Sequence, residues 1–122
     1  MTDNTTDTQS NDIQGQMFLY EKPELLTPEE HGHLGLTPQD NRFENTRDAS
    51  AIPLTVVEFG SAQRHYPIVF SSLEKPVPLA ALGVLGTPNL FVDENGRWDV
   101  LADVPAYLPC YPFPFAQDAS GR

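Results

Sequence analysis

Two histidines one residue apart, His31 and His33, form the first pattern in the sequence with possible chemistry. In an extended segment residues i and i+2 point to the same side, so both imidazoles could hold one metal ion. Such a site needs a further ligand, and the next histidine, His65, lies far along the chain on a separate predicted element. The competing interpretation is a surface turn that contains two histidines. We favour the turn and keep His31 and His33 as the candidate metal ligands.

Cys110 is the single cysteine, so it cannot form an internal disulfide or supply a structural zinc site alone. It lies between Pro109 and Tyr111 and lacks the local residues that accompany a catalytic thiol. A packed or surface thiol is the simpler interpretation, and a nucleophilic pair with His31 or His65 is the alternative. We predict no catalytic residue, no cofactor and no bound metal.

Other motifs with known chemistry are incomplete. No serine lies in a Gly-x-Ser-x-Gly turn, and the glycines at 83 and 86 are not followed by the Lys-Ser or Lys-Thr of a phosphate-binding loop. Residues 93–96 begin like a calcium loop but lack its alternating ligands and closing glutamate. Because Asn95 and Gly96 suit a tight turn, we predict a hairpin turn there.

The elements that must position these side chains are predicted mainly after residue 52. Thr55 and Glu58 have the spacing of a capping box, in which each side chain accepts from the other residue's amide. This predicts a helix from Val56 to about Arg64, which must end before Pro67 because proline restricts the residue before it. His65 would lie at the C-terminus of that helix, a structural position that favours a protonated imidazole.

Three apolar runs predict a small antiparallel sheet, namely Ile68–Phe70, Leu79–Leu85 and Asn89–Asp93. Trp98 follows them and is the largest core residue available. A second short helix is predicted over Asp103–Leu108, with Pro105 in its first turn and Pro109 ending it. The predicted fold class is therefore α+β, with Trp98 and Tyr107 closing one end of the core.

The first part of the chain is predicted to carry less structure. Residues 1–16 contain three aspartates, no basic residue and almost no apolar side chain, which predicts a disordered acidic arm. Residues 17–51 form an extended lead-in, where scattered prolines and glycines exclude a long helix. Within it, Met17–Tyr20 could form an edge strand, and Thr27–Glu30 has the residues of one capped helical turn.

The composition excludes several classes of protein. Seventeen acidic against seven basic side chains give a net charge of −10, which argues against binding to nucleic acid or to an anionic membrane. The first residues lack the basic and apolar regions of a signal peptide, and no apolar run approaches the roughly 20 residues of a membrane span. We expect a cytoplasmic protein without membrane insertion, with leaderless export or surface association left open.

The aromatic segment near the C-terminus is the predicted interaction surface. Its alternating prolines exclude a central strand, and an exposed aromatic run favours association. The predicted core, residues 52–115, is marginal in size for independent stability, and residues 116–122 form a tail. We therefore expect a protein partner or self-association through Tyr111, Phe113 and Phe115.

A series of short motifs follows a specific order from residue 53 to residue 113. The residues that carry it, which we predict to be structural, are Tyr66, Pro67, Phe70, Asn89, Phe91, Asp93, Gly96, Arg97, Trp98, Pro105 and Tyr107. The series resembles the bacterial SapC family, with a fainter likeness back to Glu21. Pro109 and Cys110 stand where that family typically has two arginines, which puts an anionic contact there in doubt. Family members also continue past Tyr-Pro-Phe, so the chain resembles an N-terminal portion or a shortened member.

The resemblance implies a role but no catalytic residue. The family is named for a surface-layer (S-layer) gene cluster, and relatives lie beside genes for flavin-dependent tryptophan halogenases, cupin-like proteins and TonB-dependent receptors. The leading hypothesis is a non-enzymatic accessory or interaction protein of a surface-layer or nutrient-uptake system. The alternatives are a subunit or adaptor of a halogenase or oxygenase, a metal-dependent oxygenase using His31 and His33, or a phage or mobile-element protein that mimics the family's first half and competes for its partner.

Overall fold

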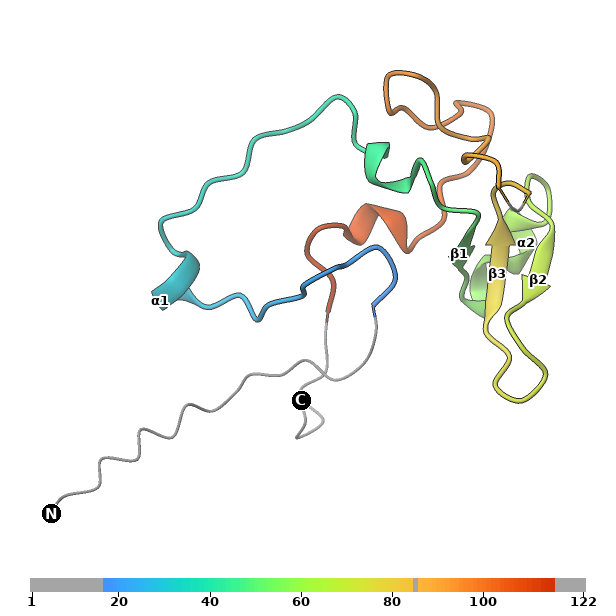
Figure 1. Cartoon of the computed structure of the whole chain (residues 1–122), viewed down its shortest axis with the longest axis horizontal. Coiled ribbons are helices and arrows are strands. Elements are labelled where there is room, and N and C mark those ends of the chain that lie inside the picture. Colours follow the sequence, from blue (N-terminus) through green and yellow to red (C-terminus); the bar gives the residue numbers. More distant parts are fainter. Residues whose placement is uncertain (1–16, 85, 116–122) are drawn as a thin grey trace, which may run out of the picture. The chain divides into compact units, whose positions relative to one another are not determined.

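Figure 1 shows the computed structural model of the chain, which describes residues 17–84 and 86–115. The predicted acidic arm, residues 1–16, and the predicted tail, residues 116–122, lie outside the described residues. The described residues fall into two units, one formed by residues 17–36 with Phe115 and the other by the described part of Thr37–Pro114. No helix among the described residues is long and apolar enough to cross a membrane.

The first unit contains the capped helical turn that the sequence predicts. This helix, α1, covers Pro28–His31, and the Thr27 hydroxyl accepts from the Glu30 amide at its N-terminus. The predicted strand at Met17–Tyr20 is wrong. Those residues form a turn in which the Tyr20 amide donates to the Met17 carbonyl at 3.1 Å. Leu19 has a φ of 70°, in the left-handed region, and this bends the backbone away from a strand.

The second unit is built on the small antiparallel sheet that the sequence predicts. Its strands are β1 (Ala51–Pro53), β2 (Ile68–Phe70) and β3 (Pro78–Ala81). The order is β1-β3-β2, with β3 antiparallel to both neighbours (Figure 1). Ala80 pairs with Ile52 on one side and with Ile68 on the other, and both Ala80 and Ile52 are fully buried. The centre of the sheet is therefore also part of the core.

The strands of this sheet differ in part from those expected. The predicted strand at Asn89–Asp93 is wrong, because there only Val92 makes an isolated bridge, to Trp98. Its place in the sheet is taken by β1, which the sequence did not predict. Pairing also continues beyond β1, since the Leu82 amide donates to the Ser50 carbonyl and the Leu54 amide to the Pro78 carbonyl.

The helices of the second unit are short. The capping box of Thr55 and Glu58 is confirmed, and it starts a 3₁₀ turn, Val56–Glu58, that runs into α2, Phe59–Ala62. The helix predicted at Asp103–Leu108 is wrong in position. A 3₁₀ turn covers Leu108–Cys110 instead, with Pro109 in its first turn, where the missing amide leaves no hydrogen bond unmade. A further 3₁₀ turn, Glu44–Thr46, lies in the predicted lead-in.

Replacing Gly96 is expected to destabilise the second unit. Gly96 has a φ of 71°, and an added Cβ would lie 2.8 Å from the Cβ of Asn41. Gly86 also has a positive φ, but an added Cβ there meets nothing within 4 Å. We expect Gly96→Ala to lower the free energy of unfolding by about 1–3 kcal/mol in urea denaturation. Gly86→Ala is the matched control, because it adds conformational strain without a close contact. An equal loss of stability in both variants would contradict the close approach of Asn41.

Candidate functional site

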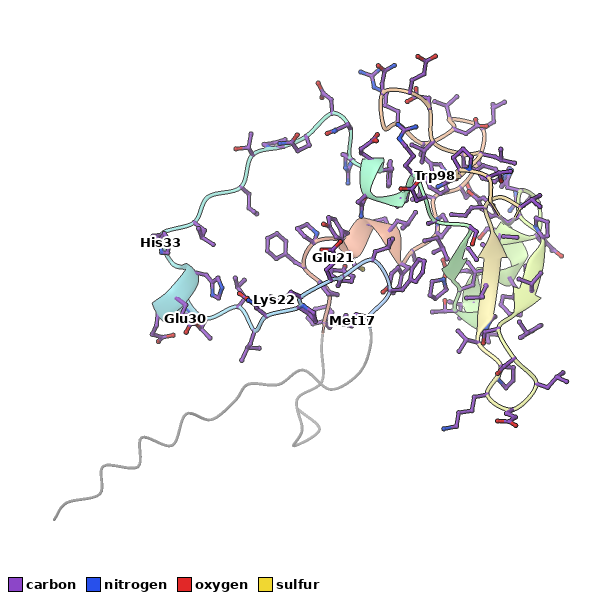
Figure 2. All side chains as sticks on the ribbon, in the orientation of Figure 1. Met17, Glu21, Lys22, Glu30, His33 and Trp98 are labelled. Carbon is purple, nitrogen blue, oxygen red and sulfur yellow. The ribbon has the colours of Figure 1, made fainter. Side chains whose placement is uncertain are left out.

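Four aromatic rings form the centre of the second unit. Trp98 packs edge-on against Phe43, with ring centroids 5.4 Å apart, and stacks on Phe91 at 5.9 Å. Tyr66 meets Phe91 edge-on at 4.6 Å. Figure 2 shows Trp98 beside the segment that carries the Glu44–Thr46 turn. Offset and edge-to-face contacts of this kind stabilise a core beyond the area they bury.

The Tyr66 hydroxyl is the polar centre of this aromatic cluster. It donates to the Asp103 carbonyl at 2.5 Å and accepts from the Trp98 indole N–H at 3.0 Å. Burial raises the pKa of Tyr66 to about 12. The phenol therefore stays protonated at neutral pH and holds the carbonyl as a donor, which is a positioning role.

A buried amide joins the start of the second unit to the segment after the sheet. The Asn89 side chain donates to the carbonyl and to the hydroxyl of Thr46, both at 3.2 Å, and accepts from the Phe91 amide at 2.9 Å. Thr46 is fully buried and donates its hydroxyl to the Phe43 carbonyl. Asn89 is thus occupied by structural hydrogen bonds rather than by strand pairing.

The predicted hairpin turn at residues 93–96 is present. The Asp93 carboxylate accepts from the Asn95 and Arg97 amides, each at 2.9 Å, and Gly96 supplies the positive φ. Arg47 holds the turn from outside, because its guanidinium donates to the Asp93 carbonyl at 2.9 Å and pairs with Glu44. The geometry is that of a braced turn and not of a calcium loop.

Glu58 connects the helical segment to the residues before the last 3₁₀ turn. One carboxylate oxygen accepts from the Thr55 amide and hydroxyl, and the other accepts from the Ala106 amide at 2.7 Å. Partial burial by itself would raise the pKa of Glu58, but these hydrogen bonds outweigh it and hold the pKa below its usual value. Next to Ala106, Pro105 is buried and Tyr107 is half-buried.

The histidines are placed separately. In the first unit, the Nδ1 atom of His31 lies 3.1 Å from the Thr27 amide nitrogen, and its Nε2 atom lies 4.0 Å from Glu24. His33, labelled in Figure 2, follows α1 and is exposed. His65 belongs to the second unit and lies in the turn after α2, with its Nε2 atom 4.0 Å from Asp103. Within residues 17–84 and 86–115, no three His, Cys, Asp or Glu side chains are grouped so that they could hold a metal.

The remaining predicted residues lie nearer the surface. Pro67, just before β2, and Phe70, the last residue of β2, are exposed. Arg97 is exposed in the hairpin turn. Cys110 is an exposed free thiol whose sulfur lies 3.6 Å from the Ala106 carbonyl. Tyr111 and Phe113 of the predicted interaction surface are exposed, and so is Phe115, which belongs to the other unit.

Sequence reasoning missed three residues that precede the predicted core. Phe43 packs on Trp98, Thr46 binds Asn89, and Arg47 braces the hairpin turn. One signal was available, because Phe43 is the single aromatic residue between Tyr20 and Phe59. The core of the second unit therefore includes part of the segment that was predicted to be a lead-in.

The family model of SapC matches residues 26–122, which is well over half of the chain. The chain belongs to the SapC family. No curated protein and no solved structure matches it significantly. The SapC match begins upstream of β1 and so includes Phe43, Thr46 and Arg47, in agreement with their place in the core.

Removing the Tyr66 hydroxyl is expected to destabilise this SapC protein. In Tyr66→Phe the Trp98 indole N–H loses its acceptor in a buried setting, and the Asp103 carbonyl loses its donor in a partly buried one. We expect the free energy of unfolding to fall by about 1–3 kcal/mol. A double-mutant cycle with Trp98→Phe isolates the indole–hydroxyl contact. Additive effects in the cycle would contradict a direct coupling between the two side chains.

Glu58 is expected to make stability depend on pH. Its folded-state pKa is lowered, so the stabilisation is complete above the unfolded-state pKa of roughly 4.3 and is lost as the pH falls through the folded-state value. Glu58→Gln should reduce stability at pH 7 and flatten its decline between pH 5 and pH 3 in urea denaturation. Glu74→Gln, an exposed site in the turn after β2, controls for the loss of one charge and should leave the profile unchanged.

Proposed function

We propose that this SapC protein is a non-enzymatic, protein-binding accessory component of a bacterial surface-layer or nutrient-uptake system. The name of the family and the resemblance described above support the setting. Among the described residues, the motif at 93–96 serves as a braced turn, and no three His, Cys, Asp or Glu side chains are grouped so that they could hold a metal. Every buried side-chain nitrogen and oxygen among the described residues has a hydrogen-bond partner within the protein. The interior therefore offers no unsatisfied polar atom to a substrate.

The observation that carries the proposal is the exposure of the C-terminal aromatic segment, Tyr111–Phe115. The Phe113 side chain is 50% exposed, and Phe115, two residues later, is fully exposed. Aromatic residues are enriched in protein interfaces, where they supply large contact areas at low cost in conformational entropy. Pro112 and Pro114, which alternate with the three aromatic residues of the segment, limit the freedom of the backbone before binding, and this favours recognition by a partner groove.

Site-specific photo-crosslinking in the native host tests this function. A photoreactive phenylalanine analogue at position 113, and separately at position 115, should give one discrete adduct with a surface-layer or outer-membrane uptake protein, identified by mass spectrometry. The same analogue at Leu73, an exposed apolar residue in the turn after β2, is the control and should give no such adduct. An equal yield from all three positions, or an adduct only with unrelated abundant proteins, would contradict the proposal.

The proposal also has a chemical test. Elemental analysis of the purified protein should find no stoichiometric transition metal. Stoichiometric iron that disappears in a His31→Ala, His33→Ala double variant would favour the oxygenase alternative and overturn the non-enzymatic function.

A further inference from the structure

The outer edge of β2 is an open hydrogen-bonding edge with apolar side chains. In the order β1-β3-β2, strand β2 has a partner on one side only, as Figure 1 also shows. Its three residues, Ile68–Phe70, are all apolar, and Val69 and Phe70 are 43% and 58% exposed. Neither charge nor proline within the strand protects this edge, although both commonly do so in natural proteins.

The hydrogen bonds to β3 determine which backbone groups of β2 face outward. The Pro67 carbonyl accepts from the Ala81 amide, and the Ser71 amide donates to the Val77 carbonyl. Bonds to one antiparallel neighbour recur at every second residue, so Val69 continues this series with its register partner, Leu79. The amides and carbonyls of Ile68 and Phe70 therefore point to the open edge.

We propose that β2 pairs antiparallel with β2 of a second copy of this chain, joining two three-stranded sheets into one of six strands. Placing Val69 opposite its symmetry mate sets Ile68 opposite Phe70 of the copy. Ile68 of each chain then forms a hydrogen-bonded pair with Phe70 of the other chain. These two pairs use both outward amides and both outward carbonyls of each β2. The same register places Phe70 against a β-branched side chain, which is a favourable cross-strand pair.

Strand length and local charge favour a second copy over an unrelated extended peptide. A longer peptide would extend past the three-residue edge, onto Pro67 at one end and onto the turn after β2 at the other. A copy of β2 matches the edge in length. The charged residues nearest β2 are Arg64 before it and the neighbours Glu74 and Lys75 after it, so an antiparallel copy brings each Arg64 toward a turn of mixed charge and meets no acidic surface, although the chain as a whole is acidic.

The contact is expected to be weak and to strengthen with salt. Three paired residues bury little surface, and each copy carries a net charge of −10, so the copies repel each other at long range. Screening that repulsion should lower the dissociation constant of the dimer. A dimer held mainly by ion pairs at the strand ends would show the opposite dependence, which would overturn the assignment to backbone pairing.

Sedimentation equilibrium of the full chain over a series of concentrations tests the proposal. Val69→Lys places like charges opposite each other across the symmetry axis and should raise the dissociation constant at least about tenfold. Leu73→Lys makes the same change of charge at a fully exposed site beyond the strand, and should leave the dissociation constant nearly unchanged. Equal effects of the two variants, or a chain that is monomeric at all concentrations, would overturn the proposal.

A second variant separates pairing from folding. Phe70→Pro removes an outward amide that the sheet itself does not use, so two of the four intermolecular hydrogen bonds are lost while β3 keeps its partners. The circular dichroism spectrum and the fluorescence of Trp98 should be retained while the dimer is lost. A dimer that persists in Phe70→Pro and disappears in Phe113→Ser would place self-association at the aromatic segment and overturn the β2 contact. Crosslinking from position 113 in the Phe70→Pro background reports on the proposed function separately.

Discussion

The Tyr66 hydroxyl joins three parts of the chain that are far apart in sequence. It lies at the end of the helical segment, accepts from Trp98 after the hairpin turn, and donates to the carbonyl of Asp103. Because Tyr66 and Trp98 are buried, the indole N–H cannot exchange this acceptor for water at low cost. The helical segment thus holds residues 103–106 at both ends, through Tyr66 and through the Glu58 carboxylate. These hydrogen bonds fix the position of residues 103–106 relative to the helical segment that follows β1.

Features that depend on neighbouring residues could be predicted from the sequence. The capping box of Thr55 and Glu58, the Thr27 cap and the turn at residues 93–96 each involve side chains no more than four residues from the groups they bind. The chemistry of a serine, threonine or aspartate beside free amides is the same whatever the rest of the fold does. The position of β2 was equally accessible, because apolar residues there follow a proline that ends the helix.

Features that depend on distant partners could not be predicted. Asn89–Phe91 has the apolar character of a strand, but the Asn89 side chain accepts from the Phe91 amide and donates to Thr46, 43 residues away. That local bond competes with a sheet ladder. β1 is only three residues long and ends in proline, so its pairing with β3 depends on burial of Ile52 and not on any local pattern. Likewise, nothing near Thr46 in the sequence indicates a buried partner for Asn89.

The residues that carry the family resemblance mostly build the scaffold, and this limits what family membership says about function. Tyr66 and Trp98 are buried and hydrogen-bonded to each other, Asn89 is buried and hydrogen-bonded to Thr46, and Gly96 is required by the close approach of Asn41. A change at any of them alters the fold before it alters binding. The exposed residues Val69, Phe70 and Phe113 carry no such constraint from the interior, so partner choice can change there while the core is kept. The proposed recognition is therefore assigned to the apolar surface, against a background of negative charge that disfavours acidic partners.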